Sequence, residues 1–167
     1  MTGGARGYWG RMQSEGRDQV ADEISEEARR RGLTVAVAES LTGGMVATAL
    51  AAAYAASAWF RGSLVAYSSE VKHAVLDVPD GPVVSAEAAQ AMASGVRRLL
   101  AADVAVAVTG SGGPSAQDGQ EPGTVYVAVD DGSGIRVQRL DLDGEPSEIC
   151  ARSAECTLRL LLDGMRG

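Results

Sequence analysis

The sequence contains few of the residues that build metal centres and disulfide frameworks. It has two cysteines and one histidine among 167 residues. Cys150 and Cys156 fall on different faces of a predicted helix, which argues against a bridge within it, and no CxxC spacing is present. Two free thiols of this kind indicate a reducing compartment. With His73 as the only histidine, neither a metal site nor a Ser-His-Asp triad is expected, and no cofactor is predicted.

Long hydrophobic runs and clustered basic residues are also missing. No stretch of about 18 or more apolar residues is present, and the first residues lack the apolar segment of a signal peptide. We therefore expect no membrane partner and a cytoplasmic location. The net charge of −7 and the isoelectric point of about 4.7 argue against nucleic acid as a partner, because binding phosphates requires clustered Lys and Arg.

Aromatic residues are scarce, with one Phe and two Trp, although 46% of the residues are hydrophobic. This composition predicts a folded core built mainly from Ala, Val and Leu. The length suits one domain. We predict a single domain over residues 17–167, preceded by a flexible tail over residues 1–16.

Lysine is almost absent: of the 15 lysines and arginines, only Lys72 is a lysine. An arginine stays protonated in a protein, whereas a lysine amine can be made neutral by burial or by its surroundings and can then act as a base. A lone lysine in an arginine-rich chain therefore suggests a catalytic position. The alternative is a compositional bias that left one lysine on the surface.

Helix and strand patterns alternate along the chain as expected for an α/β fold. Strands separated by helices are parallel and carry helices on both faces, and the turn at residues 131–134 signals a hairpin. The predicted fold is a three-layer α/β/α sandwich with a mostly parallel sheet extended by an antiparallel hairpin. The predicted helices cover residues 17–31, 43–58, 69–77, 85–101 and 147–162, and the predicted strands cover residues 33–38, 63–67, 104–109, 124–129 and 135–142.

Three segments of unusual composition follow the first three predicted strands, at residues 39–44, 67–72 and 109–114. The carboxyl ends of parallel strands share one edge of the sheet, where ligands bind in open α/β folds. The third segment, TGSGGP, has the glycines of a phosphate-cradling loop but lacks the lysine of a P-loop. We therefore expect the functional site at this edge.

Ser40 and Lys72 are the candidate nucleophile and base. Ser40 lies at a strand-to-helix turn, where Gly43 and Gly44 let backbone N–H groups approach an anion or a developing oxyanion. Lys72 lies in the first turn of the next helix, where the helix dipole favours a neutral amine. The alternative interpretations are that Ser40 only caps its helix and that Lys72 pairs with a surface carboxylate.

Five motifs in this order resemble the CinA C-terminal domain family, known as nicotinamide mononucleotide (NMN) deamidases. They are AESLTGG at residues 38–44, SAWFRGSLVAYSSEVK at 57–72, VSAEAAQAMASG at 84–95, AVAVTGSGGP at 105–114 and PGTVYVAV at 122–129. The resemblance runs from about Val20 to the last helix. It implies a three-layer α/β/α domain of the stand-alone form, assembled as a homo-oligomer (a dimer or larger).

The resemblance also implies an activity: hydrolysis of the NMN carboxamide to nicotinic acid mononucleotide and ammonia, with no cofactor. Ser40 would be the nucleophile and Lys72 its base, assisted by Tyr67. The expected substrate-binding residues are Thr42, Gly43, Gly44, Thr109, Gly110 and Gly113.

The chain departs from the family pattern where a nucleotide phosphate would bind. The family's GDR before the last helix is Gly144-Glu145-Pro146 here, and Cys150 stands where a further arginine is usual. Arg139 and Arg152 are the candidates to replace these cations. Two alternatives follow: a deamidase for a nicotinamide compound without a phosphate, or a catalytically weak relative that binds a nucleotide or a partner and regulates.

Overall fold

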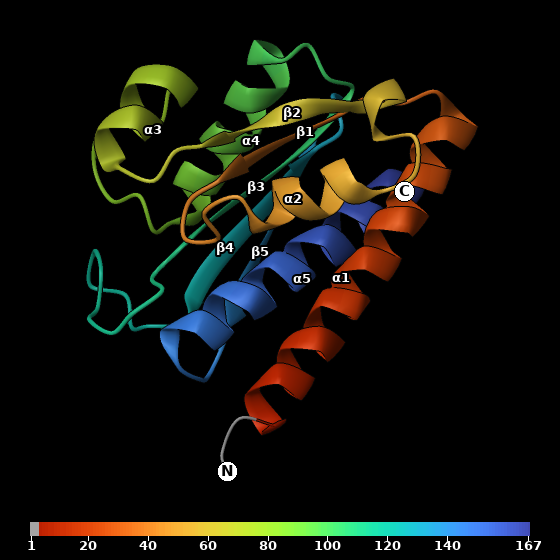
Figure 1. The fold of residues 1–167 in the computed structure, drawn as a ribbon. Helices are drawn as coiled ribbons and strands as arrows, with labels where there is room; N and C mark the ends of the chain where they lie inside the picture. The colour runs from red at the N-terminus through yellow and green to blue at the C-terminus, as the bar shows by residue number, and fades with distance from the viewer. Residues whose placement is uncertain (1–3) are drawn as a thin grey trace.

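Five strands form one mixed sheet in the order β2-β1-β3-β4-β5 (Figure 1). The computed structural model describes residues 4–167, with side chains from Glu15 onward. Strand β1 pairs in parallel with β2 and β3, whereas β3–β4 and β4–β5 are antiparallel. The predicted fold class is confirmed. The elements are α1 (Gly4–Arg31), β1 (Val35–Glu39), α2 (Met45–Ala52), η1 (Ala56–Ala58), β2 (Phe60–Val65), α3 (Ser69–Leu76), α4 (Ala86–Leu99), β3 (Val104–Gly110), β4 (Thr124–Asp130), β5 (Ile135–Asp141) and α5 (Pro146–Arg166).

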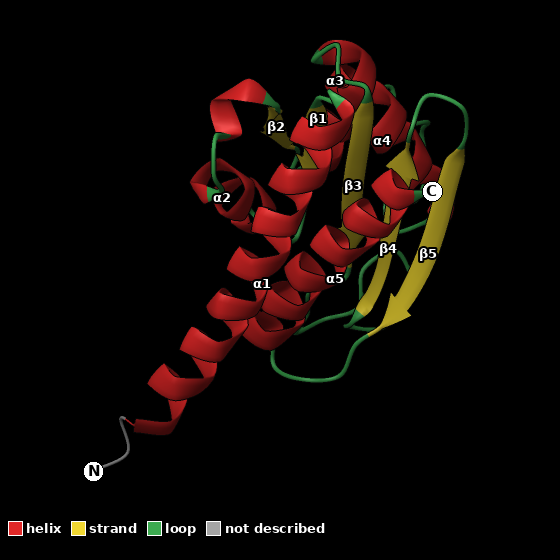
Figure 2. Cartoon of the chain, turned by 90° about the vertical axis from the view of Figure 1, so that its right-hand side faces the viewer, coloured by secondary structure: helices red, strands yellow, loops and turns green. Residues whose placement is uncertain are grey.

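Valine and alanine alternate along the central strands, and this alternation divides the core into two layers. Because successive side chains of a strand point to opposite faces, the valines of β1, β3 and β4 pack with α1, α2 and α5. The alanines of the same strands pack with α4. Figure 2 shows α1 and α5 side by side on one face of the sheet and α4 on the other. Small side chains on the second face let α4 lie close to the sheet.

Helix α1 begins earlier than the sequence predicted. Its backbone is helical from Gly4, whereas the sequence predicted a helix from Arg17. A glycine in a helix costs only about 1 kcal/mol, and no proline interrupts residues 4–16, so this segment can continue the helix. Residues 1–3 lie outside the described part of the chain.

The alanine-rich segment after β1 contains a shorter helix than predicted. Helix α2 ends at Ala52, and the chain turns through Ala55, whose φ of 51° is left-handed, into the short η1. The Tyr54 carbonyl at this turn accepts hydrogen bonds from the Ser25 hydroxyl and the Trp59 indole. Tertiary contacts to α1 therefore override the high helix propensity of alanine.

One edge of the sheet collects the ends of several elements. Strands β1, β2 and β3 end there at Glu39, Val65 and Gly110, and the antiparallel β4 begins there at Thr124. Strand β5 returns the chain to the same edge, so α5 starts beside it (Figure 1). The predicted edge therefore gains a fourth segment, the first turn of α5. None of the helices within residues 4–167 combines the length and hydropathy that a bilayer crossing requires.

Candidate functional site

A pocket of about 470 Å³ opens at this edge of the sheet. Four of the predicted site residues line it: Ser40 after β1, Tyr67 after β2, and Gly110 and Gly113 at the end of β3. The structure therefore brings together residues from all three predicted segments. The remaining lining residues are Leu41, Met45, Gly112, Ser115, Gln117, Pro146, Ser147 and Cys150.

Ser40 follows directly on β1 and is 6% exposed. Its carbonyl accepts the Gly43 N–H at 3.1 Å, which closes a tight turn before α2. Gly44, with φ of 106°, is the N-cap of α2, and no side chain of its own caps the helix. The interpretation that Ser40 merely caps α2 is therefore wrong, and its side chain is left to line the pocket.

The buried carboxylate of Glu39 caps α2 instead. It is fully buried and accepts the N–H groups of Val46 at 2.9 Å and Ala47 at 3.0 Å, as well as the Thr42 hydroxyl at 2.8 Å. A carboxylate at a helix N-terminus is favoured by the helix dipole. This role of Glu39 was not predicted from the sequence, although an acidic residue at the end of a strand and just before a helix could have indicated it.

The Glu39 cap changes which backbone groups can face a substrate. The N–H groups of Gly43 and Met45 are used within the turn, by Ser40 and Thr42 carbonyls. Within the part of the chain described, the N–H groups of Leu41, Thr42 and Gly44 have no protein acceptor. These groups are available as donors to an anion near Ser40, and of the three residues Leu41 lines the pocket.

Lys72 is buried, with 1% of its surface exposed, and is not among the residues that line the pocket. Its Nζ donates a hydrogen bond to the Tyr67 carbonyl at 3.0 Å. Burial lowers the pKa of the Lys72 ammonium below the ordinary lysine value, and the Asp118 carboxylate opposes part of that shift. The surface-lysine interpretation is therefore wrong. The Tyr67 ring, 72% exposed, lies at the pocket mouth.

No hydrogen bond joins Lys72 Nζ to Ser40 Oγ among the described residues, and Lys72 is not one of the residues that line the pocket. Tyr67 is common to both, because its carbonyl accepts the Lys72 hydrogen bond and the residue lines the pocket with Ser40. Hydrogen bonds of a catalytic group are often long or poorly aligned before substrate binds.

Thr109 and Asp118 hold the segment before α4 against this site. The Thr109 hydroxyl is buried and donates to the Val83 carbonyl at 2.7 Å. The Asp118 carboxylate accepts the N–H groups of Val83 at 2.8 Å and Val84 at 3.0 Å. Thr109 therefore ties elements together and does not line the pocket. Asp118 was missed because it lies in a long loop whose only sequence signal is an Asp-Gly pair.

A glycine is required at position 110 for close packing. A Cβ there would lie 2.9 Å from the Thr124 carbonyl oxygen and 2.8 Å from Val125, so only glycine lets β3 approach β4 this closely. Gly110 is therefore required for the packing of β3 against β4, in addition to its predicted role in binding a ligand.

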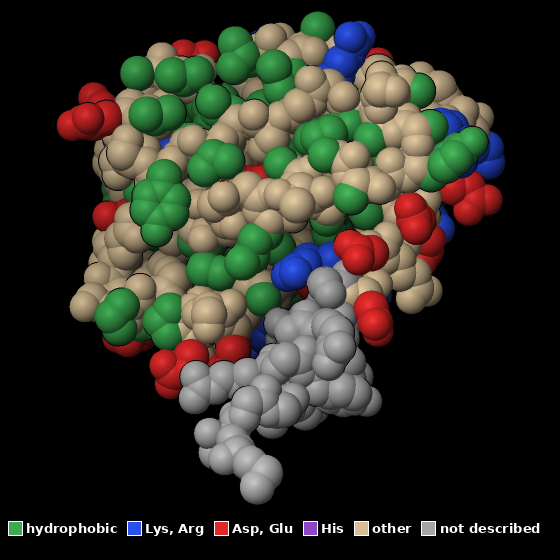
Figure 3. Space-filling model, viewed as in Figure 1, with side chains coloured by type: hydrophobic (Ala, Val, Ile, Leu, Met, Phe, Trp, Pro, Cys, Tyr) green, Lys and Arg blue, Asp and Glu red, His purple; other side chains and the backbone are tan. Residues whose placement is uncertain are grey.

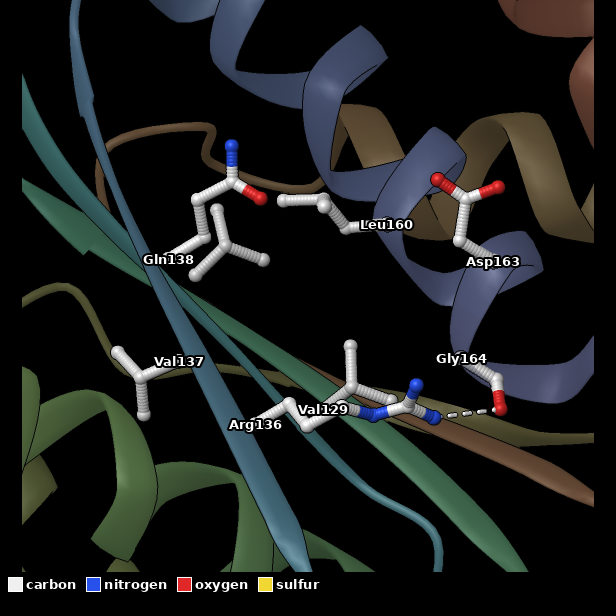
Figure 4. Close-up of a pocket in the computed structure, with 8 residues that line it drawn as sticks. Val129, Arg136, Val137, Gln138, Leu160, Asp163 and Gly164 are labelled. Atoms are coloured by element: carbon white, nitrogen blue, oxygen red, sulfur yellow. Dashed lines mark hydrogen bonds between the residues drawn. The ribbon is translucent and has the colours of Figure 1, made fainter. Parts of the chain in front are cut away.

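A larger hollow, of about 610 Å³, lies away from these residues, between β5 and the end of α5. Figure 4 shows Arg136 and Gln138 from β5 and Asp163 and Gly164 from α5 around it, with the Arg136 guanidinium bonded to the Gly164 carbonyl. None of its lining residues is a serine, cysteine, lysine or histidine. The smaller pocket at Ser40 is therefore the better candidate site.

Thiol and metal chemistry have little support in the described residues. Burial raises the pKa of the Cys150 thiol, whose Sγ donates to the Leu41 carbonyl at 3.2 Å, and burial also raises the pKa of Cys156. Both cysteines are free. Across residues 4–167, no three His, Cys, Asp or Glu side chains are grouped so as to hold a metal ion.

Comparison with known proteins gives consistent matches. The sequence profile of the CinA C-terminal domain matches residues 17–165. A CinA-like protein from Citrifermentans bemidjiense is 40% identical over 149 residues, which cover 86% of this chain and 36% of that protein. One from Geobacter sulfurreducens is 38% identical over 142 residues, covering 81% of this chain and 34% of that protein. The chain thus spans about a third of the length of these curated relatives.

Solved structures match the fold over almost the same region. The competence damage-inducible protein A from Klebsiella pneumoniae superposes with a TM-score of 0.86 at 30% identity, covering 90% of this chain and 97% of that one. The competence/damage inducible protein CihA from Agrobacterium tumefaciens gives 0.85 at 28% identity, covering 91% and 96%.

Proposed function

The chain belongs to the CinA C-terminal domain family, and from this membership and the pocket at Ser40 we propose that it hydrolyses the carboxamide of a nicotinamide nucleotide, NMN in the first instance. The products are nicotinic acid mononucleotide and ammonia. The observation that carries the proposal is the position of Lys72. The single lysine of the chain is buried against the carbonyl of Tyr67, which lines the same pocket as Ser40.

The first half of the reaction forms an acyl-enzyme. Neutral Lys72 takes the proton of Ser40 Oγ as that oxygen attacks the carboxamide carbon. The N–H groups of Thr42 and Gly44 stabilise the negative oxygen of the tetrahedral intermediate. The Lys72 ammonium then returns its proton to the leaving nitrogen, which departs as ammonia. This leaves an ester on Ser40 and a neutral amine on Lys72.

The second half of the reaction restores the enzyme. Lys72 removes a proton from water, the hydroxide attacks the ester carbon, and the carboxylic acid leaves as Ser40 regains its proton. For both halves Lys72 Nζ must exchange its hydrogen bond with the Tyr67 carbonyl for one with Ser40 Oγ. The lowered pKa makes the neutral amine available for this exchange.

Ammonia release from NMN tests this proposal. We expect Ser40→Ala to reduce kcat by about a thousandfold or more, because the nucleophile is lost. Lys72→Arg keeps a positive charge but removes the base, so it should be almost as inactive. Ser57→Ala is the matched control, since Ser57 is exposed on η1, ahead of β2 and therefore at the opposite edge of the sheet. Activity of Ser40→Ala equal to that of Ser57→Ala would disprove the dyad.

A second candidate is a regulatory protein that binds a nucleotide or a partner without turnover. The observation in its favour is the missing hydrogen bond between Ser40 and Lys72 among the described residues. This candidate predicts NMN binding by calorimetry with no ammonia release, and an affinity that Lys72→Arg leaves unchanged. Single-turnover ammonia release by the wild type would rule it out.

A further inference from the structure

We infer that this pocket selects an N-ribosylated nicotinamide without its phosphate, a nucleoside-class carboxamide, in preference to the nucleotide. This inference rests on the proposed function for the reaction and adds the substrate class. The observation behind it is the distribution of charge at the pocket: the lining contains no cation that could hold a phosphate.

The lining of the pocket is uncharged. Its residues supply hydroxyl, amide, thiol and apolar groups, and the described side chains include no Lys, Arg, Asp or Glu among them. A phosphate in a protein site is normally held by arginine or lysine, or by a helix N-terminus. Without lining cations, an anionic group entering the pocket loses its hydration and meets no opposite charge beyond the partial charge of the N–H groups at the start of α2.

The two arginines that could approach the pocket are engaged elsewhere. Arg139 makes two hydrogen bonds to the Asp141 carboxylate, at 3.1 and 2.9 Å, and its guanidinium lies over the Tyr126 ring. Arg152 donates to the backbone carbonyl of Asp143 at 2.7 Å. The Arg139 guanidinium is therefore bonded to the end of β5, and the Arg152 guanidinium is bonded to the segment between β5 and α5. Neither is bonded to a residue that lines the pocket.

The start of α5, which forms part of the pocket wall, carries two acidic side chains, Glu145 and Glu148. The Glu148 carboxylate accepts the N–H of Glu145 at 2.9 Å, and the Glu145 backbone carbonyl accepts the N–H of Glu148 at 2.9 Å. Pro146, at the first position of the helix, has no N–H to donate. The negative side chains at this helix end oppose the attraction that it would otherwise exert on an anion.

What the pocket does offer suits a ribosylated pyridinium. Ser115, Gln117 and Ser147 supply neutral hydrogen-bonding groups for sugar hydroxyls, and Tyr67 supplies an aromatic face for a cationic ring. A volume of about 470 Å³ is within the range of small-molecule sites, roughly 300–1,000 Å³. In Figure 3, acidic side chains border this face at its left and lower left, and acidic and basic side chains are mixed at its right. The surroundings therefore favour a cationic over an anionic ligand.

The test compares two substrates that differ only by the phosphate, nicotinamide riboside and NMN. Ammonia release by the wild type should give a kcat/KM for the riboside at least about tenfold higher than for NMN, the effect of about one missing charge-assisted hydrogen bond. Calorimetric binding of both compounds to Ser40→Ala gives the same comparison without turnover. The preference should weaken as salt is added, because salt screens the repulsion of the phosphate.

A cation added to the pocket wall should reverse the preference. Ser147 is exposed and lines the pocket, so Ser147→Arg places a guanidinium there, and Ser147→Gln is the uncharged control of similar length. We expect Ser147→Arg to raise kcat/KM for NMN relative to the riboside by about tenfold, and Ser147→Gln to leave the ratio near that of the wild type.

The possible results separate the two claims. Equal or better turnover of NMN at low salt overturns the inference and leaves the proposed function standing. Tighter binding of the riboside without ammonia release upholds the inference and overturns the function. If neither compound binds or reacts, both claims fail.

Discussion

At the scale of single residues, Lys72 is placed where a lysine lowers stability. A buried amine resists protonation because the charged form loses its hydration. Among the described residues, the one hydrogen-bond partner of its amine is a neutral carbonyl, that of Tyr67. Functional residues commonly carry such a penalty, which the rest of the fold offsets.

Replacing Lys72 by Met should therefore stabilise the protein at neutral pH. The pKa of Lys72 is lower in the folded than in the unfolded state, so between these two values the unfolded chain binds more protons and stability rises with pH. The loss of stability caused by burying Lys72 is fully present at pH values below the pKa of Lys72 in the folded protein. It is gone at pH values above the ordinary pKa of a lysine. The gain from Lys72→Met should shrink across that window.

Urea unfolding at a series of pH values measures this effect. Arg98→Met is the control, because Arg98 is exposed and pairs with an exposed Asp77, so a change within about 0.5 kcal/mol is expected. A Lys72→Met protein that is less stable than the wild type at neutral pH would contradict the assigned penalty.

Asp118 should set the pH at which Lys72 becomes neutral. Its carboxylate attracts the ammonium, so Asp118→Asn should lower the pKa of Lys72 further and move the rising limb of the kcat/KM profile to lower pH. Asparagine accepts the same two N–H groups and tolerates the left-handed φ of 52°. Asp163→Asn, at the far end of α5, is the control. A limb that stays in place or moves to higher pH would refute the coupling.

At this scale the sequence predicted the edge at which Ser40 and Tyr67 meet, while the roles of Ser40, Tyr67 and Lys72 stay predictions. Ser40 and Lys72 were selected by their residue types and positions, and Tyr67 by the family resemblance. The side-chain partner of Lys72 is a backbone carbonyl five residues away, which the choice of residue types does not indicate. The tie from Asp118 to Val83 joins segments 35 residues apart, which no local pattern encodes.

At the scale of elements, the turn between β1 and α2 depends on Glu39. Its carboxylate replaces a conventional N-cap side chain and also holds the Thr42 hydroxyl and, at 3.4 Å, the Ser63 hydroxyl of β2. One side chain thus fixes the start of α2, the turn that carries Ser40 and the neighbouring strand. The turn between β1 and α2 is stabilised by the hydrogen bonds that the buried Glu39 carboxylate accepts.

Glu39→Gln should destabilise the protein by roughly 2–3 kcal/mol, because an amide NH₂ then faces buried donors that lose their acceptor. Chemical denaturation measures the loss. Glu87→Gln is the matched control: Glu87 is exposed in the first turn of α4, and its change should stay within about 0.5 kcal/mol. Equal effects of the two substitutions would show that the Glu39 contacts contribute little.

The three edge segments predicted from the strands do not include α5, which only the family resemblance associated with the site, through Pro146 and Cys150. Its helical pattern was predicted, but its position follows from two antiparallel pairings that carry the chain away from the edge and back. That return brings Pro146, Ser147 and Cys150 into the pocket wall. From the strand pattern, only the predicted hairpin and the strand order together would have indicated it.

At the scale of the whole molecule, the fold followed from the sequence because its signals are redundant. The runs VAVA and VAVAV are apolar on both faces, which only a sheet covered on both sides can bury. The apolar character of these runs predicted only that they are buried. In the structure the valines face one helical layer and the smaller alanines face the other, so the two faces of the sheet differ in side-chain volume.

The burial of the only lysine gives the molecule one more property, in its response to labelling reagents. An amine-reactive reagent needs a neutral, accessible amine, and besides the chain's α-amine the sole side-chain target is Lys72, at 1% exposure. Acylation of Lys72 is therefore slow while the site is closed and proceeds only when the Tyr67 region opens. The rate at which the peptide that contains Lys72 becomes labelled, followed by mass spectrometry, would therefore report the rate of that opening without an engineered probe.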